Sequence, residues 1–365
     1  MHFFKINKKF KTIKASFVFE VKKQDDYVLV DVRSPSEWEL DRIPGSINIP
    51  ILDDLERAEV GTIFTKSGLN LAIEKGLEFV EPKLDDLLLT FSKFKQKKII
   101  IYCWRGGLRS KSVVQFLEMN GFDVFQLEKG VKAYRHFVRK KISSYKLKPR
   151  LIIIYGMGLS GKTELLNKTN LHMIDLEGIA QHRSSVYGAL GFKPRSQKLF
   201  EAIFLDKIEE LKDVDYILVE GESKRIGRVV IPDFFYALFK SGVQIRLDAS
   251  LDRRAQRFLD DYCDNKNKIN EFVEITKNSQ LFVKIMGKNK VLEIISLISS
   301  YEPDKITAGL KILLKDYYDI KYEHFFKDKN FDLVLFEDDV LIALQKIEKH
   351  VSVLRLKKED NKKFK

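Results

Sequence analysis

Cysteine is scarce in this chain, and long apolar runs are missing. The 365 residues include two cysteines, Cys103 and Cys263, which lie far apart and form no CxxC pair. A disulfide framework and a paired-cysteine metal site are therefore excluded, and a reducing compartment is indicated. The longest apolar runs, such as Leu151–Tyr155, are much shorter than the ~18 residues that a membrane span needs. Because the basic opening MHFFKINKKFKTIK also lacks the apolar stretch of a signal peptide, we expect a cytoplasmic protein with no membrane partner.

Acidic residues are outnumbered by basic ones, 52 against 65, which leaves a formal net charge of +13. Such a charge favours a polyanionic partner. A lysine-rich solvated surface accounts for the charge equally well, so nucleic acid becomes the expected partner only if the motifs also indicate it.

The first part of the chain, residues 10–138, alternates short strands with helices, which is typical of a parallel α/β sheet covered on both faces. Ser34 followed by Pro35 and Glu37 predicts a capped helix start. Asn120-Gly121 predicts the end of a helix that begins near Ser110. The expected strands are Tyr27–Val32, Ser46–Ile49, Lys98–Cys103 and Asp123–Leu127.

A change of composition marks the end of this domain. Residues 139–150, RKKISSYKLKPR, hold six basic residues and no acid, and we interpret them as a basic linker. Residues 151–263 form a second α/β unit in this interpretation, and residues 264–365 a mostly helical C-terminal region that ends in a frayed basic tail. The strands expected in the second unit are Leu151–Tyr155, Tyr216–Glu220 and Val243–Leu247.

Cys103 ends an apolar strand and opens the loop CWRGGLRS, which leads into a helix. The loop contains two arginines, Arg105 and Arg109, and its Gly106-Gly107 pair lets the backbone turn its N–H groups inward. All these features stabilise an anion, as a nucleophilic thiolate requires. A buried structural cysteine is the alternative, and the loop composition favours the nucleophile. We therefore predict Cys103, Arg105 and Arg109 as catalytic residues.

A phosphate-binding loop follows the strand Leu151–Tyr155. The sequence GMGLSGKT matches GxxxxGK[ST] and precedes a helix-prone stretch, which is the context that the motif requires. Backbone N–H groups would hold phosphate oxygens, Lys162 would neutralise them, and Thr163 would ligate Mg²⁺ if a nucleotide is bound. The predicted phosphate-binding residues are Gly156, Gly158, Ser160, Gly161, Lys162 and Thr163.

Other charged residues carry two interpretations each. Glu220 and Glu222 could serve a metal or a water, or simply solvate a strand end, so we assign no metal site. Arg253, Arg254 and Arg257 could grip an anion or form a charged helix face. Glu56-Arg57 could lie on a solvated helix or at the rim of a site.

Three further residues have a structural interpretation. We expect Asp31 and Arg33 to form an ion pair that braces the first domain, and Glu37 to cap a helix.

The first domain resembles the rhodaneses, in which the loop cysteine carries a transferable sulfur. The resemblance rests on DVRSPSEW at Asp31–Trp38, on IPGSINIP at Ile43–Pro50 and on the cysteine loop. This loop is one residue longer than in the usual sulfur-carrying members, which suits a bulkier group.

The whole chain resembles the tRNA 2-selenouridine synthase family, which fuses a rhodanese domain to a P-loop domain. Further matching stretches are GVKAYR at Gly130–Arg135, DLEG at Asp175–Gly178, His182-Arg183, QKLFE at Gln197–Glu201 and DYYD at Asp316–Asp319. The chain departs from the family pattern at Lys129, Ser184, Gly221 and Ile320.

The resemblance implies a transferase that modifies wobble 2-thiouridine in tRNA. Geranyl diphosphate first alkylates the sulfur, and selenophosphate then displaces the thioether to leave 2-selenouridine. The implied partners are tRNA, selenophosphate and geranyl diphosphate, with no tightly bound cofactor. Lys162 would stabilise the diphosphate leaving group, Cys103 would act on selenophosphate, and Phe200–Leu205 could line a pocket for the geranyl chain or simply pack in the core.

Two other functions stay open at this point. One is a rhodanese-type sulfurtransferase coupled to nucleoside triphosphate hydrolysis, with Cys103 as a persulfide carrier. The other is a non-catalytic tRNA-binding scaffold, against which the intact Cys103, Lys162 and Thr163 argue.

Overall fold

A computed structural model describes residues 11–363 of the chain, and the surroundings of side chains up to residue 354. The chain forms two compact units. The first runs to Ser144 and takes in Lys198–Leu205, and the second comprises Tyr145–Gln197 and the residues from Asp206 onward.

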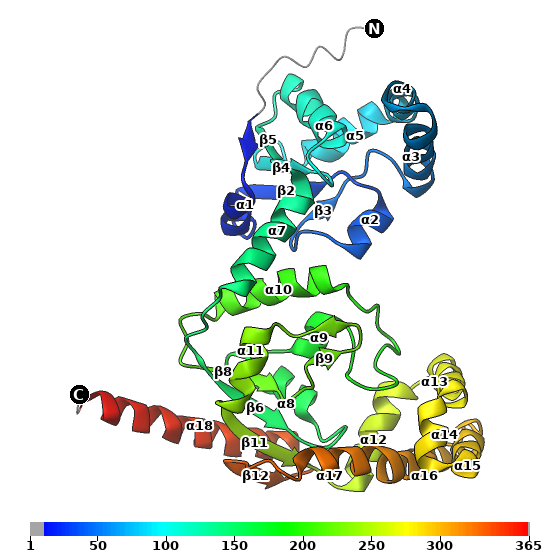
Figure 1. The fold of residues 1–365 in the computed structure, drawn as a ribbon, viewed down its shortest axis with the longest axis vertical. Helices are drawn as coiled ribbons and strands as arrows, with labels where there is room; N and C mark the ends of the chain where they lie inside the picture. Colours follow the sequence, from blue (N-terminus) through cyan, green and yellow to red (C-terminus); the bar gives the residue numbers. More distant parts are fainter. Residues whose placement is uncertain (1–10, 364–365) are drawn as a thin grey trace. The chain divides into compact units, whose positions relative to one another are not determined.

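The first unit is built on a parallel sheet in the order β1-β5-β4-β2-β3 (Figure 1). Its central strand β4 is buried from its second residue on, because helices cover the sheet on both faces. The predicted strands are confirmed to within one or two residues at each end. The strands are β1 (Thr12–Ile13), β2 (Tyr27–Asp31), β3 (Ile47–Asn48), β4 (Lys98–Tyr102) and β5 (Val124–Leu127).

Helices α5 and α6 contribute Leu87, Phe91 and Leu117 to one core cluster with the strands, while α1 and α7 pack together on the opposite side (Figure 1). The predicted cap of α2 is confirmed, since the Ser34 N–H donates to Glu37 Oε2 at 3.4 Å. The helices are α1 (Ala15–Val21), α2 (Pro35–Leu40), α3 (Asp54–Ser67), α4 (Leu69–Val80), the 3₁₀ turn η1 (Glu81–Lys83), α5 (Leu84–Ser92), α6 (Leu108–Met119) and α7 (Gly130–Ser143).

The predicted linker is shorter than its composition indicated. Its first residues belong to α7, because Tyr134, Val138 and Ile142 continue one buried face of that helix. Its last residue, Arg150, opens a strand of the next unit. The segment between α7 and the first strand of the next unit is thus confined to residues 144–149.

The second unit contains another parallel sheet, in the order β12-β11-β6-β8-β7. The three predicted strands are confirmed, and β7 and β12 are added to them. A separate antiparallel pair, β9 and β10, lies outside this sheet. The strands are β6 (Arg150–Tyr155), β7 (Met173–Ile174), β8 (Tyr216–Glu220), β9 (Arg225–Ile226), β10 (Val229–Val230), β11 (Val243–Asp248) and β12 (Leu333–Phe336).

The C-terminal region is mostly helical, as predicted, but it is not a separate extension after residue 263. Its strand β12 pairs with β11, and α18 packs on the sheet through Ala343, Ile347 and Val351. The predicted frayed tail is wrong as far as Lys363, because α18 (Val340–Lys363) continues to that residue, and residues 364–365 lie outside the described residues. The other helices of the second unit are α8 (Lys162–Lys168), α9 (Leu176–Ala180), α11 (Asp233–Ala237) and the turn η2 (Leu238–Lys240), while α10 (Gln197–Glu210) contains the segment Lys198–Leu205 that belongs to the first unit.

The remaining helices form a cluster around Tyr187 and Phe272, whose rings stack with centroids 3.9 Å apart. Cys263 is buried in this cluster. None of the helices within the described part of the chain is long and apolar enough to cross a membrane. The cluster's helices are α12 (Leu251–Tyr262), α13 (Lys266–Asn278), α14 (Gln280–Met286), α15 (Lys288–Ile298), α16 (Pro303–Leu313) and the π-helical segment η3 (Leu314–Asp319), which continues into α17 (Ile320–Phe326).

The junction before α7 depends on two residues with positive φ, Lys129 at 58° and Gly130 at 59°. A Cβ on Gly130 would lie 2.1 Å from the carbonyl oxygen of Cys103. We predict that Gly130→Ala lowers the free energy of unfolding of the first unit by about 1–3 kcal/mol, because it adds left-handed strain and a backbone clash.

Lys129→Gly is the matched control, and it should stay within about 1 kcal/mol of wild type because relief of strain offsets the added chain entropy. Both tryptophans, Trp38 and Trp104, belong to the first unit, so their fluorescence during denaturant unfolding reports on it. Equal stability of Gly130→Ala and wild type would contradict this account of the junction.

Candidate functional sites

The loop after β4 opens into a cavity of about 670 Å³ in the first unit. Cys103, Arg105 and Arg109 all line it, so the structure brings the three predicted catalytic residues to one place. The Cys103 thiol is only 3% exposed, and its Sγ lies 3.2 Å from the hydroxyl of Ser110. A reactant therefore reaches this thiol through the cavity.

Backbone hydrogen bonds hold the cysteine loop in place. The carbonyl oxygens of Cys103 and Trp104 accept from the N–H groups of Val131 and Lys132 at 3.0 and 3.1 Å. The amide of Gln126 donates to the Gly106 carbonyl at 3.0 Å and to the Ser110 hydroxyl at 2.7 Å. The first turn of α7 and strand β5 thus position the loop. This gives the GVKAYR stretch, which begins α7, a structural role in holding the cysteine loop.

A carboxylate organises the arginines at the rim of the cavity. Glu37 Oε2 lies 2.5 Å from Arg109 Nη1 and 3.6 Å from Arg57 Nε. Partial burial alone would raise the pKa of Glu37, but the hydrogen bond and charge of Arg109, with Arg57, outweigh it and lower the pKa. The predicted capping role of Glu37 is incomplete, because the same side chain also holds two arginines.

Side-chain contacts elsewhere in the unit test the sequence interpretations of two residue pairs, Asp31 with Arg33 and Glu56 with Arg57. Arg33 Nη2 lies 2.6 Å from Asp31 Oδ2, and both side chains are buried, so the predicted ion pair is confirmed. Arg57 lines the cavity, whereas Glu56 caps α3 through the Asp53 N–H at 2.9 Å and pairs with Lys83.

The rest of this cavity is apolar. Its wall comes largely from α3 and α4, which pack against each other, and from α5 and α6. The sequence suggested a site rim only at Glu56-Arg57 on α3, and the apolar residues of the hairpin look like an ordinary core-facing stripe. Its lining residues include Val60, Phe64, Leu69, Ala72, Gly76 and Leu77.

The second unit has a cavity of about 460 Å³ beside the phosphate-binding loop. Lys162 lines it, and in this structure its Nζ donates to the carbonyls of Gly156 and Met157 at 3.2 and 3.1 Å. The other predicted phosphate-binding residues in the wall are Gly158, Ser160, Gly161 and Thr163.

Gly156, also predicted to bind phosphate, is not part of this wall. A Cβ there would lie 1.9 Å from the carbonyl oxygen of Leu247, so Gly156 permits the close approach of β11. Ser160 has a buried hydroxyl with no partner among the described residues, which suits a loop built around an anion.

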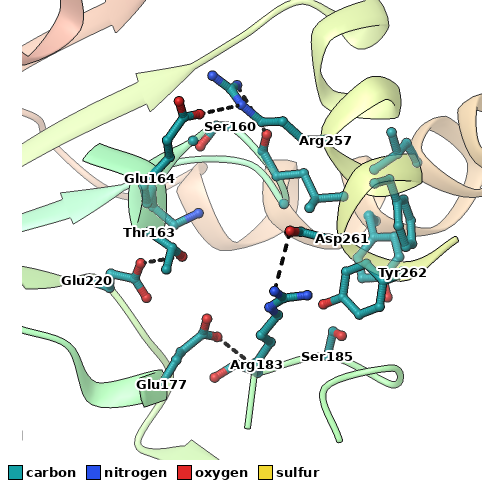
Figure 2. A pocket seen from close by; sticks show the side chains of 18 of the residues that line it. Ser160, Thr163, Glu164, Glu177, Arg183, Ser185, Glu220, Arg257, Asp261 and Tyr262 are labelled. Carbon is teal, nitrogen blue, oxygen red and sulfur yellow. Dashed lines mark hydrogen bonds and ion pairs between the residues drawn. The ribbon is translucent and has the colours of Figure 1, made fainter. Parts of the chain in front are cut away.

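The three arginines of α12 have different roles: one supports the phosphate-binding loop, and the other two line the cavity. Arg254 donates to the Gly158 carbonyl at 2.9 Å and pairs with Asp319 of the DYYD stretch. Arg257 pairs with Glu164 at 3.3 Å and also lines the cavity, as Arg253 does (Figure 2). The anion-gripping interpretation therefore suits Arg253 and Arg257, whereas Arg254 supports the loop itself.

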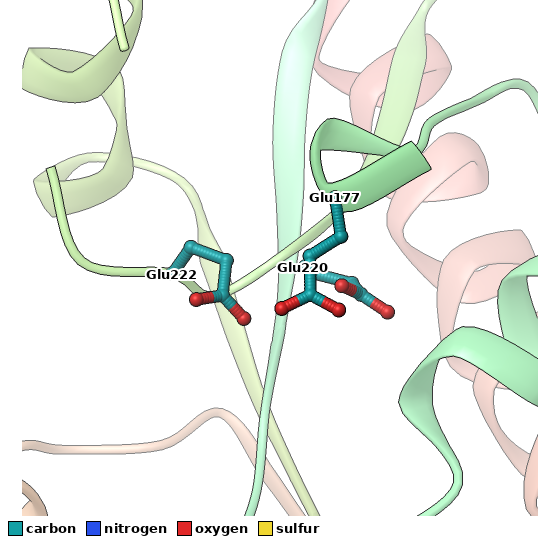
Figure 3. Close-up of side chains that lie close together, drawn as sticks. All are labelled: Glu177, Glu220 and Glu222. Carbon is teal, nitrogen blue, oxygen red and sulfur yellow. The ribbon is translucent and has the colours of Figure 1, made fainter. Parts of the chain in front are cut away.

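Three carboxylates face one another beside the loop. Glu177, Glu220 and Glu222 offer oxygen atoms that lie within 4.8 Å of one another (Figure 3). The Thr163 hydroxyl donates to Glu220 Oε1 at 2.7 Å (Figure 2). Burial raises the pKa of each of these carboxyls, and the neighbouring carboxylates raise it further.

This carboxylate cluster could hold a divalent cation. Glu220 is 1% exposed, and its Oε2 has no partner among the described residues, so a cation would satisfy a buried oxygen as well as relieve the repulsion. Sequence reasoning identified Glu220 and Glu222 without deciding for a metal. It missed Glu177, whose only signal was the DLEG stretch.

Of the two interpretations of Phe200–Leu205, the structure supports core packing. Phe200, Phe204 and Leu205 are fully buried, and none of them lines the cavity. The apolar lining that they could have formed beside the phosphate-binding loop is not present there.

Comparison with known families identifies both units. The family model of the rhodanese-like domain matches residues 19–136, and that of the tRNA 2-selenouridine synthase AAA domain matches residues 149–352. A tRNA 2-selenouridine synthase from Shewanella frigidimarina is 32% identical over 352 residues, which cover 89% of this chain and 95% of that protein. One from Nitrosomonas europaea is 35% identical over 245 residues, which cover 65% of this chain and 64% of that protein.

Two solved structures match part of the chain. The N-terminal domain of a protein from Clostridium difficile, described as ATP/GTP binding, is 42% identical, covers 35% of this chain and 98% of its own, and has a TM-score of 0.33. A rhodanese-related protein from Thermoplasma volcanium is 23% identical, covers 35% of this chain and 93% of its own, and has a TM-score of 0.22.

The Glu37 contacts predict a pH-dependent contribution to stability. Glu37→Gln should lower the free energy of unfolding of the first unit by about 1 kcal/mol at neutral pH, because Arg57 and Arg109 lose their charged partner. A carboxyl with a lowered pKa stabilises the fold above its unfolded pKa of about 4.3, and this contribution disappears as the pH falls through the lower folded value. The difference between variant and wild type should therefore shrink below that pH, as measured by tryptophan fluorescence.

Glu39→Gln, on the exposed side of the same helix, is the control and should match wild type throughout. A Glu37→Gln deficit that stays constant down to acidic pH would show that the charge of Glu37 is not what stabilises the rim.

Proposed function

This chain belongs to the tRNA 2-selenouridine synthase family, and from this premise and the two cavities we propose that it is a selenotransferase. Its substrate is the wobble 2-thiouridine of tRNA, and its product is 2-selenouridine. Geranyl diphosphate alkylates the sulfur first, and selenophosphate then replaces the geranylthio group. The cytoplasm is the compartment in which we expect the reaction.

The observation that carries this proposal is the meeting of Cys103, Arg105 and Arg109 in one cavity. Selenophosphate is an anion, and arginines balance its charge while a thiol acts on it. Arg109 is already oriented by Glu37, whereas Arg105 is exposed and makes no ion pair with any described residue. Arg105 is thus available to the incoming anion.

We place the first reaction at the phosphate-binding loop. Alkylation of the sulfur releases diphosphate, and Lys162 with the loop N–H groups would stabilise the charge that develops on this leaving group. Glu177, Glu220 and Glu222 would hold Mg²⁺, which when bound supplies further charge neutralisation to the diphosphate.

Contact with tRNA would use the basic segment around the connection between the units. Arg139 and Lys140 on α7, with Lys146, Lys148 and Arg150 beyond it, are all exposed. Five exposed basic side chains in so short a stretch suit the phosphates of an RNA backbone.

A second candidate function is favoured by the carboxylate cluster. A P-loop with Thr163 and a cation-binding group beside it is also the arrangement that binds a nucleoside triphosphate with Mg²⁺. The alternative is then a sulfurtransferase coupled to hydrolysis of ATP or GTP, with a persulfide on Cys103.

The role of Cys103 predicts a block between the two reactions. In Cys103→Ala, tRNA binding and folding should persist, 2-selenouridine should be absent, and S-geranyl-2-thiouridine should accumulate. Nucleoside mass spectrometry of tRNA incubated with both substrates measures this. Cys263→Ala is the control, because burial raises the pKa of Cys263 to about 12 and the side chain lies in a helical core. Normal selenation by Cys103→Ala would remove Cys103 from the mechanism.

The role of Lys162 predicts the complementary defect. Lys162→Ala should slow geranylation by about 10²–10³-fold, because the charge on the leaving diphosphate loses its cation. The same variant should still convert tRNA that was geranylated beforehand.

Titration of the wild-type protein with geranyl diphosphate and with ATP decides between the two functions. We expect binding of geranyl diphosphate. Tight ATP binding with turnover, together with no response to geranyl diphosphate, would favour the nucleotide-coupled sulfurtransferase instead.

A further inference from the structure

The wall of the cavity beside Cys103 contains large apolar side chains that the fold leaves exposed. Phe64 is 56% exposed, Leu69 51% and Leu77 40%, and all three line the cavity. Helix α3 buries none of its residues, and α4 buries only Ala72. The hairpin of α3 and α4 therefore presents an apolar face to the cavity instead of burying it in a core, which is the mark of a binding surface.

The occupant of this cavity must be apolar at one end and reactive at the other. The hairpin supplies the apolar wall, while Cys103, Arg105 and Arg109 supply a nucleophile and cations in the same cavity. A volume of about 670 Å³ is that of a small-molecule site. A protein segment seated here would cover the thiol, whereas a hydrocarbon chain can lie along the hairpin and leave the thiol accessible.

The cavity of the second unit does not offer the same environment. Its wall mixes apolar side chains, such as Phe258 and Leu314, with the charged side chains of Lys162, Glu177, Arg183, Glu220 and Arg253. The wall of the cavity beside Cys103 is apolar apart from the thiol loop and the arginines at its rim. The cavity beside Cys103 is therefore the more apolar of the two, and a hydrocarbon chain gains more from leaving water there.

We propose that the cavity between Cys103 and the α3–α4 hairpin holds the geranyl chain of S-geranyl-2-thiouridine while selenium replaces sulfur. This inference rests on the proposed function, and it adds the place where the intermediate is recognised. The chain enters the apolar part, which sets the thioether carbon of the base near Cys103 and the arginines.

The bonds balance in this arrangement. The selenium of selenophosphate, which Cys103 and the arginines hold beside the base, forms a bond to C2 of the base, and the bond from C2 to sulfur breaks. The electron pair leaves with the geranylthiolate, which takes a proton from water. Water then cleaves the phosphorus–selenium bond and releases phosphate, leaving 2-selenouridine. The departing geranylthiol keeps its chain in the same apolar cavity until it dissociates.

A consequence is that the cavity selects the geranylated base over its precursor. Unmodified 2-thiouridine has no chain to bury, and a methyl thioether buries almost none. Affinity should therefore rise with chain length because each buried methylene contributes to transfer out of water. Recognition of the chain would order the two reactions, with alkylation before selenation.

Gly76 on α4 offers a variant that fills the cavity without disturbing the fold. It lines the cavity, and a Cβ there would meet no atom within 4 Å. Leucine is also a better helix former than glycine, so Gly76→Leu should not destabilise α4. Glu74→Leu is the matched control, because it adds the same side chain to an exposed position of the same helix outside the cavity wall.

The test measures equilibrium binding of the full chain to anticodon stem-loop RNAs that carry S-geranyl-2-thiouridine or S-methyl-2-thiouridine. We expect the wild type and Glu74→Leu to prefer the geranyl RNA by about tenfold or more. Gly76→Leu should lose most of that preference while its affinity for the methyl RNA stays unchanged. Tryptophan fluorescence of each variant checks that the first unit is folded.

Three results would overturn the inference: equal wild-type affinity for the two RNAs, an equal loss of affinity for both RNAs in Gly76→Leu, or a change of oligomeric state in that variant. The last result would mean that a second copy covers the hairpin. Selenation of the geranyl RNA by the same wild-type preparation keeps these failures apart from failure of the proposed function, which would be shown by no conversion of either RNA.

Discussion

Both sites depend on the parallel arrangement of the two sheets. In a parallel sheet all strands end at the same edge, so residues that follow different strands are brought together there. Cys103 follows β4 directly, and the ion pair of Asp31 and Arg33 lies at the end of the neighbouring β2. In the second unit Gly156 follows β6 and Glu220 ends β8 beside it. The order of the strands in each sheet therefore determines which residues meet in its cavity.

The chemistry of the two edges nevertheless differs, because different elements cover them. In the second unit α9 and α12 bring Glu177, Arg253 and Arg257 to the phosphate-binding loop, so charges surround it. In the first unit a helical hairpin inserted after β3 brings apolar side chains to the cysteine loop. In the reaction that we propose, the charged edge would hold a diphosphate and the apolar edge the hydrocarbon chain of the thioether intermediate.

Local patterns were enough to predict the longer strands, because each is a short apolar run. They were also enough to predict the cysteine loop and the phosphate-binding loop, in which glycines and a reactive residue follow such a run. The features that could not be predicted depend on packing between distant segments. The strand β12 is four residues long and lies in a helical stretch, so only its pairing with β11 defines it. Glu177 and Glu220 are far apart in the sequence, and only the fold brings their carboxylates together. The apolar stripe of α4 could be recognised as a cavity wall only once the segments around it were known.

The central claim is that this chain places selenium in tRNA, and its most direct test uses cells that carry the gene and cells from which it has been deleted. Both are grown with selenium, and the nucleosides of their tRNA are separated and identified by mass spectrometry. The account predicts 2-selenouridine only in cells with the gene, and unmodified 2-thiouridine in its place when the gene is absent. The same amount of 2-selenouridine in both would contradict it.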